Sequence, residues 1–527
     1  MPEFTQESLH QEFDGPTLQL TRHAEKTLAQ HSKPRGEFTF GVLADTHIFG
    51  QTVKWKDDVL RDLLQTCTDA GSEFIMVAGD LGTSQNEQPR GDRIAKQSET
   101  FVEAIDSILG CPAVFISVGN HELDGGKAAW LEALYPGVVS GLVGDGNDRF
   151  IYYAFDYCGC HFICLDGHRR IEGANRMRGA VGRLNATHFA EIPDEQFEWL
   201  EQDLERNRGK LTFVFMHEPT EQIEHNRPWH MLRNRGRLID VLSRYPDVKW
   251  VFHGHTHHHS QVKAWGLNIC HIGKHRPQVL QVDGEAATIY DAEPHGKLSE
   301  VTFYDLNAVH RSRLRQEGDR FVYGIAEDGP EENGNSPLLE GAEIVAGEDG
   351  VTPPRSQKMI RVHHPVEPKK AGEVSHHFGY LTMDCIIEIQ KGMKFSYDVY
   401  FDSNSAFDNF SLSLIINTRD GGCYEPLRDG NGLLMDTAGE NPLDAFYNLS
   451  ENDGGYHAPS LRGKANAQWY HRECDLSSLA GGWIVGVLAI ATPPKIEAKP
   501  GGYLKFYLSN LTLSWPVSEG ELQPSLR

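Results

Sequence analysis

The chain has 527 residues, more than one ordinary domain needs, so we expect at least two domains. Its 74 acidic and 50 basic residues give a formal net charge of −24. Binding to long nucleic acids depends on neutralising phosphates with Lys and Arg, so this balance argues against a nucleic-acid-binding protein. A small anionic substrate remains compatible with it if metals or arginines reverse the charge locally.

The N-terminal segment 1–13 has neither the basic nor the apolar region of a signal peptide, and no apolar run is long enough to span a membrane. The nine cysteines are odd in number and share no short repeated spacing, which favours reduced thiols. Cys158, Cys160 and Cys164 come closest to a cluster, but their alternation along a predicted strand favours buried thiols over a metal site. We therefore expect a cytoplasmic protein without a membrane span.

Residues 1–37 read as a polar leader, and after them five predicted strands each end in metal-competent side chains. In chain order these are Phe40–Ala44 with Asp45 and His47, Phe74–Ala78 with Asp80, Val114–Val118 with Asn120, His121 and Glu122, Phe213–Met216 with His217 and Glu218, and Trp250–Phe252 with His255 and His257. Ligands of open α/β sheets gather at the carboxyl ends of strands, so we expect these side chains at one edge.

Each of these segments also has an ordinary structural explanation. Asp80 could cap a helix, Asn120 could occupy a turn, and the run from His257 to His259 could be a polar His-rich turn. Taken together and in this order, the five segments favour a metal site over coincidence.

Helical periodicity alternates with the strands. Apolar residues recur at helical spacing in segments 55–67, 94–110, 194–206 and 236–244. This βαβα order predicts an α/β fold in which helices cover a mostly parallel sheet. Shorter strands at 279–282, 287–290 and 300–304 are expected to close the sheet.

The loop 166–193 is locally basic in an acidic chain, with five arginines against three acids. This reversal predicts a lid that grips phosphate, with Arg169 and Arg170 as the substrate-binding residues. A solvated insertion explains the same composition equally well.

Residues 308–370 are rich in acids, Gly and Pro in two stretches, so we predict a linker with little packing. From 371 to 527 apolar and polar residues alternate in strands at 393–401, 410–417, 469–475, 483–491 and 503–515. This pattern is typical of an antiparallel sandwich or jelly roll that folds by itself.

The C-terminal pattern also loosely resembles carbohydrate-binding and galactose-binding-like jelly rolls. A contact with carbohydrate would use aromatic side chains for stacking, although most such residues in a sandwich belong to its core. The candidates are Tyr456, Trp469, Tyr470 and Trp483.

The ordered set DxH…GD…GNHE…H…GHTH resembles the calcineurin-like metallophosphoesterases, especially the cyclic-nucleotide phosphodiesterase type, over Phe38 to Asp305. The resemblance implies a four-layer α/β/β/α catalytic domain over 38–307, followed here by the jelly-roll-like sandwich. It also implies two metal ions. One is held by Asp45, His47 and His257, the other by Asn120, His217 and His255, with Asp80 bridging both.

Two further positions follow from the resemblance. His121 matches the family's non-ligand histidine, which contacts the phosphate or the leaving group. As imidazolium it would stabilise the developing charge or protonate the leaving oxygen; the alternative is that it only supports a neighbouring ligand. Glu218 departs from the pattern, since many relatives carry a second histidine there.

The chemistry of these donors predicts a phosphoesterase. Two cations shield phosphate charge and acidify a bridging water, and a carboxylate is the natural bridge because it has two oxygens. Imidazoles with oxygens suit Mn, Fe, Zn or Ni better than Ca. We therefore expect hydrolysis of a small phosphodiester, or a monoester, by a metal-bridging hydroxide. The alternative is a non-catalytic binding or docking protein, with carbohydrate contact through the sandwich.

Overall fold

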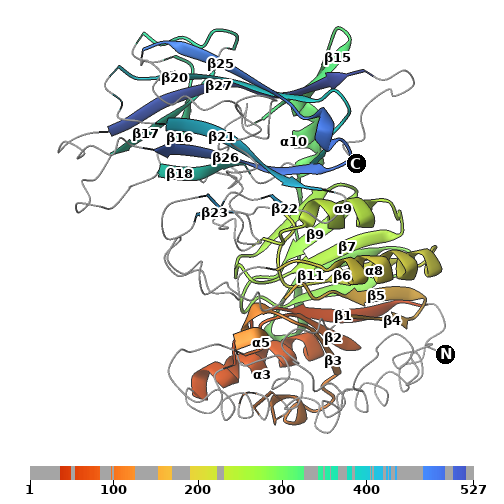
Figure 1. Cartoon of the computed structure of the whole chain (residues 1–527). Coiled ribbons are helices and arrows are strands. Elements are labelled where there is room, and N and C mark those ends of the chain that lie inside the picture. The colour runs from red at the N-terminus through yellow and green to blue at the C-terminus, as the bar shows by residue number, and fades with distance from the viewer. Residues whose placement is uncertain are drawn as a thin grey trace.

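The structure is a computed structural model. It describes residues 36–48, 54–82, 97–124, 152–168, 190–221, 231–325, 342–365, 377–418, 423–435, 467–492 and 503–517, with short gaps inside several of these ranges. Two regions follow one another, an α/β region and a β-rich region (Figure 1).

The α/β region contains two sheets. The first is six-stranded in the order β12-β11-β10-β1-β2-β3, and the second is seven-stranded in the order β13-β8-β9-β7-β6-β5-β4. The strands of the first are β1 (Phe38–Leu43), β2 (Phe74–Ala78), β3 (Ala113–Ser117), β10 (Gln278–Val282), β11 (Ala287–Glu293) and β12 (Lys297–Glu300). Those of the second are β4 (Tyr153–Tyr157), β5 (Cys160–Cys164), β6 (Thr212–Phe215), β7 (Val248–His253), β8 (Ser260–Ala264), β9 (Leu267–His271) and β13 (Tyr304–Asp305).

Aromatic side chains fill the space between the two sheets. Phe40 and Phe74 stack with ring centroids 5.1 Å apart, and Phe40 meets Phe213 of the opposite sheet edge-on at 5.2 Å. These rings belong to one buried cluster that draws on both sheets. Phenylalanine at alternate strand positions therefore joins the two sheets face to face.

Helices cover both outer faces. They are α3 (Lys54–Asp69), α8 (Asp194–Arg206) and α9 (Arg235–Ser243), while the short helix α5 (Asn120–Asp124) follows the end of β3. Leu60 and Leu64 of α3 pack on the first sheet, while Leu200 of α8 and Leu238 of α9 pack on the second. The four-layer α/β/β/α arrangement predicted for this region is therefore confirmed.

Parallel pairing brings the ends of the central strands to one edge. Strands β1, β2 and β3 run parallel in the first sheet, and β5, β6 and β7 run parallel in the second. The outer strands β10, β11, β4 and β8 pair antiparallel. The sheets are thus mixed, and the strand predicted at 300–304 is divided between β12 and β13 of different sheets.

The β-rich region is a sandwich of two antiparallel sheets around one core, which includes Phe395, Leu414 and Phe506. One sheet holds β14 (Leu314–Glu317), β15 (Arg320–Gly324), β16 (Ala342–Val345), β17 (Met359–Pro365), β20 (Lys394–Phe401), β25 (Trp469–Asp475) and β27 (Tyr503–Pro516). The other holds β18 (His377–Thr382), β19 (Ile387–Glu388), β21 (Asn409–Asn417), β22 (Cys423–Tyr424) and β26 (Trp483–Thr492). The short strands β23 (Leu427–Arg428) and β24 (Leu434–Met435) pair with each other.

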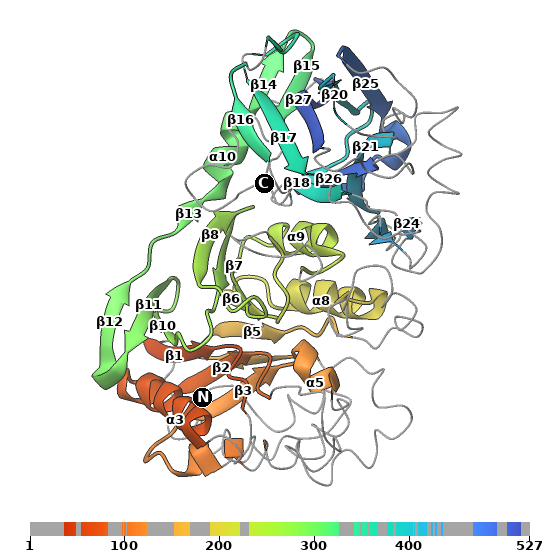
Figure 2. The same cartoon turned by 90° about the vertical axis from the view of Figure 1, so that its left-hand side faces the viewer.

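The prediction that 308–370 packs little is wrong. Helix α10 (Leu306–Arg313) leads from β13 into β14, and Figure 2 shows it between the two regions. Strands β15 and β17 both pair with β27, for example Phe321 with Trp515. The acidic, Gly-rich stretches around 327–334 and 347–354 interrupt the strand pattern in the sequence, so only pairing with distant β27 reveals these strands.

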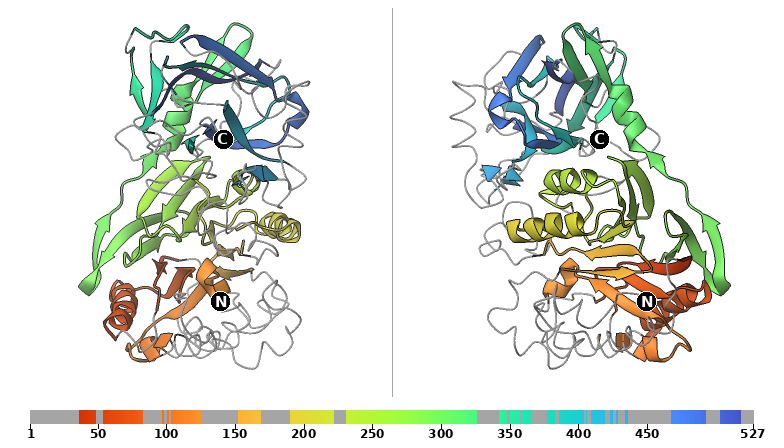
Figure 3. Two further views of the ribbon diagram at one scale, coloured as in Figure 1. Left: turned by 60° about the vertical axis from the view of Figure 1, so that its left-hand side comes forward. Right: turned by 90° about the vertical axis from the view of Figure 1, so that its right-hand side faces the viewer.

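The two regions touch. Trp483 and Val485 of β26 and Ile415 of β21 belong to the same buried cluster as Leu238 of α9. Figures 1 and 3 show α9 directly beside the sandwich. The helices that the structure describes include none long and apolar enough to cross a membrane. Cys158, Cys160 and Cys164 are buried, as predicted.

Candidate metal centre

The backbone is strained where the strands end. Asp45, His47, Asp80, His255 and His257 all have positive φ, between 47° and 68°. Non-glycine residues rarely adopt this conformation, and such strain collects at functional sites. Hydrogen bonds between the ends of β1 and β2 hold part of it: Asp45 N donates to Gly79 O at 3.1 Å and His47 N to Asp80 O at 3.1 Å. The polar side chains thereby turn back across the edge of the sheets.

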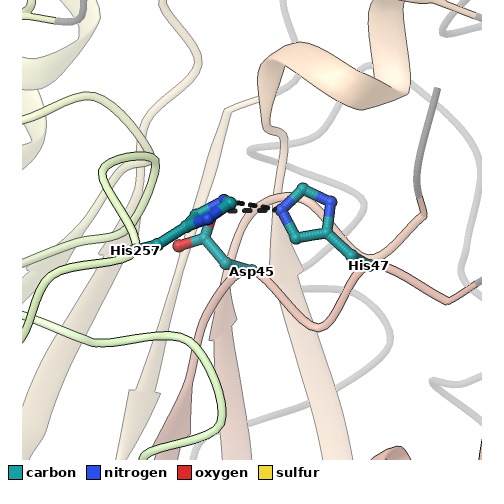
Figure 4. A group of neighbouring side chains, drawn as sticks. All are labelled: Asp45, His47 and His257. Carbon is teal, nitrogen blue, oxygen red and sulfur yellow. Dashed lines mark hydrogen bonds and ion pairs between the residues drawn. The ribbon is translucent and has the colours of Figure 1, made fainter. Parts of the chain in front are cut away.

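Asp45, His47 and His257 form the first group, with ligand atoms within 4.8 Å of one another (Figure 4). The Nε2 atoms of His47 and His257 lie 2.8 Å apart. Asp45 is fully buried, with its Oδ1 3.6 Å from His47 and 3.4 Å from His257. In the described part of the chain, neither Asp45 oxygen accepts a hydrogen bond. Three electron-pair donors thus converge with little else to bind, which fits a cation.

Asp80, His217 and His255 form a second group, again within 4.8 Å. The Asp80 Oδ2 lies 3.1 Å from His217 Nε2 and 3.9 Å from His47 Nε2. Asp80 therefore faces the first group as well as the second. Its carboxylate is 1% exposed, so neighbouring protein groups or ions must compensate its charge.

Asn120 begins α5 and is also buried. Its Oδ1 lies 3.2 Å from His217 Nε2, at the same edge as the second group. All seven residues predicted as metal ligands are thus brought together from five strand ends that are far apart in the sequence.

Glu122 is a site residue that the sequence reasoning named without giving it a role. Its buried carboxylate accepts backbone N–H groups from Gly119 at 2.7 Å, Leu81 at 2.9 Å and Asp80 at 3.1 Å. It therefore ties the turn after β2 to the turn after β3. An acid two residues after Asn120, beside a Gly-Asp turn, is the signal in the sequence that could have indicated this role.

Charge within the site is strongly coupled. Burial acts to raise the pKa of Asp45, but the imidazoles of His257 and His47 outweigh it and lower the pKa to about 2. Burial also acts to raise the pKa of Asp80, but His217 and His121 outweigh it and hold this pKa well below its usual value. Burial likewise opposes the rise at His217, whose pKa the Asp80 charge holds well above its usual value. Both carboxylates are therefore ionised at neutral pH and present negative charge to a cation.

His121 lies at the accessible side of the group. Its backbone N donates to Asp80 Oδ1 at 2.9 Å, and its Nε2 lies 3.6 Å from Asp80 Oδ2. Its side chain is 22% exposed, whereas that of Asp80 is 1% exposed. His121, His47 and Asp80 also place their ligand atoms within 4.8 Å of one another and form a third metal-competent group. The geometry therefore allows His121 either to face substrate or to approach a metal.

Glu218 forms a buried ion pair with His168, whose ring centroid lies 5.8 Å from that of His217. Burial acts to lower the pKa of His168, but Glu218 and Asp166 outweigh it and raise the pKa. Glu218, where the sequence departs from the family pattern, thus has His168 as its buried partner.

Several predicted residues lie outside the described part of the chain. They are Arg169, Arg170 and Tyr456, together with residues 1–35 of the leader. The arginine lid stays a prediction.

Comparison with known sequences agrees with the geometry. Residues 38–259 match the family described as calcineurin-like phosphoesterase. A probable cyclic nucleotide phosphodiesterase of Rhodococcus erythropolis is 24% identical over 244 residues, which are 45% of this chain and 70% of that protein. The 3',5'-cyclic adenosine monophosphate phosphodiesterase CpdA of Escherichia coli K12 is 23% identical over 227 residues, 41% of this chain and 68% of that protein.

Solved structures also align with this chain. A dimetal phosphatase from Danio rerio aligns at 16% identity with a TM-score of 0.39, covering 49% of this chain and 99% of that one. A carbohydrate-binding module of the β-sandwich superfamily aligns at 9% identity with a TM-score of 0.21, covering 46% of this chain and 76% of that one. Both TM-scores are below 0.5.

Proposed function

We propose that this chain, whose residues 38–259 match the calcineurin-like phosphoesterases, is a dinuclear-metal-dependent phosphoesterase that acts on a small phosphorylated substrate. The observation that carries the proposal is the position of Asp80. Its buried carboxylate faces His217 and His255 on one side and His47 on the other, as a ligand shared by two cations would.

The seven donor side chains are suited to hold two cations. Asp45, His47 and His257 would hold one ion, and Asn120, His217 and His255 the other, with Asp80 between them. Imidazole nitrogens and carboxylate oxygens without thiolates favour Mn, Fe or Zn. Bound there, the metals would supply charge shielding for the phosphate and a water of lowered pKa.

The chain's own residues would then orient and protonate the substrate. His121, on the accessible side of Asp80, would donate a proton to the leaving oxygen. Glu122 would keep the two turns in register by binding three backbone N–H groups at 3.1 Å or less. Fixed positions matter, because a displacement of about 1 Å can cost about 10²-fold in rate.

Within this class we favour a phosphodiester over a monoester, because the two curated relatives named above bear the names of cyclic-nucleotide phosphodiesterases. The test is hydrolysis of bis(p-nitrophenyl) phosphate, p-nitrophenyl phosphate and 3',5'-cyclic AMP by the full chain, loaded in turn with Mn, Zn and Fe. We expect the diesters to be preferred in kcat/KM. Preference for the monoester would reverse this choice, and no hydrolysis with any metal would overturn the proposal.

A second candidate, carbohydrate contact through the sandwich, has less support. Trp483 is 4% exposed and packs against α9, and Tyr470 packs against the sandwich core. Trp469 and Tyr400 lie with ring centroids 5.5 Å apart and pack against the cluster of Val351, Met359 and Tyr507. The described aromatic candidates thus all have packing partners. Binding of soluble oligosaccharides, measured by calorimetry, would revive this candidate.

A further inference from the structure

The turn before α9 joins two parts of the molecule that the sequence keeps far apart. Leu232 N donates to Pro219 O at 2.9 Å, and Pro219 is two residues after His217. Arg233 N donates to Ala190 O at 3.0 Å. We call residues 231–236 the α9 turn. It supports the loop that carries His217.

The sandwich holds the other side of the α9 turn. Asn417, the last residue of β21, donates from Nδ2 to Arg233 O at 2.9 Å and accepts at Oδ1 from Gly236 N at 3.0 Å. The Arg235 guanidinium donates to Val485 O of β26 and, at 3.3 Å, to Leu232 O. A single side-chain amide of the sandwich thus binds two backbone groups of this turn, Arg233 O and Gly236 N.

These bonds replace a missing local cap. The first N–H groups of a helix lack intrahelical partners and are usually satisfied by the N-cap side chain. In α9 the N-cap is Asn234, whose side chain makes no cap bond. It binds Ile192 instead, accepting from N at 3.1 Å and donating to O at 2.7 Å. The cap of α9 is therefore supplied by Asn417, about 180 residues further along the chain.

The packing around the bonds allows little adjustment. Asn417 is 1% exposed. A Cβ added at Gly236 would lie 2.8 Å from Trp483 Cβ and from Val485 Cγ1, and 3.0 Å from Asn417 Oδ1. An added side chain at Gly236 would therefore push the sandwich or the α9 turn out of place. The sandwich and the α9 turn are thus closely packed at this point.

We propose that Asn417 is a positioning residue for the metal centre: by capping α9 from the sandwich, it fixes the α9 turn and, through Leu232 and Pro219, the loop of His217. The proposal builds on the proposed function, since it makes the C-terminal sandwich a structural part of the phosphoesterase site. The path is short: one side-chain bond to Arg233 O, the adjacent peptide, and one backbone bond to Pro219 O.

The test compares Asn417→Ala in the full chain with Asn307→Ala. Asn307 of α10 is a matched control, because its Oδ1 also accepts a backbone N–H, from Trp265 at 2.7 Å, and neither residue belongs to the metal groups. We measure hydrogen exchange of the Leu232 amide in metal-free protein, Mn²⁺ and Zn²⁺ affinity, and kcat and KM on bis(p-nitrophenyl) phosphate.

For Asn417→Ala we expect faster exchange at Leu232, metal affinity lower by about tenfold, and a fall in kcat with little change in KM, since supports of ligands usually cost about 10–100-fold in affinity. Asn417→Asp keeps the acceptor for Gly236 N and should recover part of each loss. Gly236→Ala disturbs the same contact from the α/β region and should cause the same losses. In the double variant with Asn417→Ala, the two losses in metal affinity should be less than additive.

Unchanged exchange and unchanged metal affinity in Asn417→Ala, or equal losses in Asn307→Ala, would overturn the inference. If the Ala variant does not fold, the same comparison is made with Asn417→Asp. Failure of the proposed function is separate: it shows as absence of metal binding and hydrolysis in the wild-type chain. Leu232 exchange in metal-free protein then still decides whether Asn417 holds the turn.

Discussion

The two regions of this molecule use β-strands in different ways. In the α/β region, β1, β2 and β7 each run into polar residues with positive φ, and all five of these residues lie in the candidate metal centre. In the sandwich, long antiparallel strands such as β21, β26 and β27 alternate buried side chains through a continuous core, and among its described non-glycine residues Ala467 and Asn510 have positive φ.

The α/β region contains strained backbone that lowers stability, whereas the sandwich consists of regular strands that raise it. Each strained residue costs about 1–3 kcal/mol and persists only when its surroundings fix it. The edge of the α/β region carries several such residues, so its geometry depends on supports such as Glu122 and the α9 turn. The regular strands of the sandwich supply one of these supports. The predictions below test this division.

The largest effect is expected at Asp80, because it faces both halves of the metal centre. Asp80→Ala should abolish hydrolysis and reduce bound metal below two ions per chain, as measured by elemental analysis. Asp80→Asn retains the side-chain shape and tolerates positive φ better, so it separates loss of charge from backbone strain.

We expect Asp80→Asn also to lose metal and activity. Asp291→Ala, which removes a carboxylate of β11 that pairs with His259, should retain both ions. Two metals per chain and activity near wild type in Asp80→Ala would contradict the shared-ligand role.

His121→Ala should keep both metals and lose turnover by roughly 10²–10⁴-fold, the usual contribution of a general acid. The reason is its position beside Asp80 with 22% of its side chain exposed. The exposed His258 of the neighbouring loop provides a histidine control with little expected effect. A loss of metal in His121→Ala would instead identify His121 as a ligand, which its place in a metal-competent group also permits.

Cutting the chain after residue 365 tests whether the two regions are separable. The sequence pattern alone predicts that a fragment of residues 1–365 keeps its metals and its turnover. The structure predicts the opposite: the cut leaves β15 and β17 without β27, and it removes Trp483 and Val485 from the core beside α9. Loss of one buried Trp alone costs about 3–5 kcal/mol.

We therefore expect the 1–365 fragment to be poorly soluble, since unpaired strand edges promote association. Where it is recovered, its thermal midpoint should be lower than that of the full chain. A fragment of 1–305 removes the unpaired strands and separates edge exposure from loss of the α9 contact. An unchanged midpoint in either fragment would show that the regions are independent.

The smallest effect concerns His161, at the opposite ends of the strands from the metal centre. Its Nδ1 lies 2.7 Å from Asp156 and its Nε2 2.6 Å from Asp203. Burial acts to lower the pKa of His161, but these two carboxylates outweigh it and raise the pKa to about 8. The folded state therefore favours the charged imidazole.

Because this pKa is raised on folding, its contribution to stability is complete below the ordinary value of 6.5 and is lost as pH rises through about 8. The shift corresponds to about 2 kcal/mol. In urea titrations, the free energy of unfolding of the wild-type protein should fall by that amount across this pH interval. His161→Gln should remove this part of the pH dependence. A pH dependence that is the same in both proteins would exclude His161 as its source.

Much of the candidate site could be predicted from the sequence. Polar residues placed directly after apolar strands, from Asp45 to His257, can be recognised one segment at a time, because strand ends and turn residues are local patterns. The helices at 194–206 and 55–67 were recognisable for the same reason, and α8 and α3 lie there. The composition of an acidic chain also set a limit on the substrate.

The tertiary structure decided which distant residues share a contact. No local pattern tells that β15 and β17 pair with β27, or that Asn417 caps α9. An amide that caps a helix about 180 residues away has the same local sequence as one in a surface turn. Its role exists only in the folded chain, where the Asn417 amide accepts from Gly236 N and donates to Arg233 O.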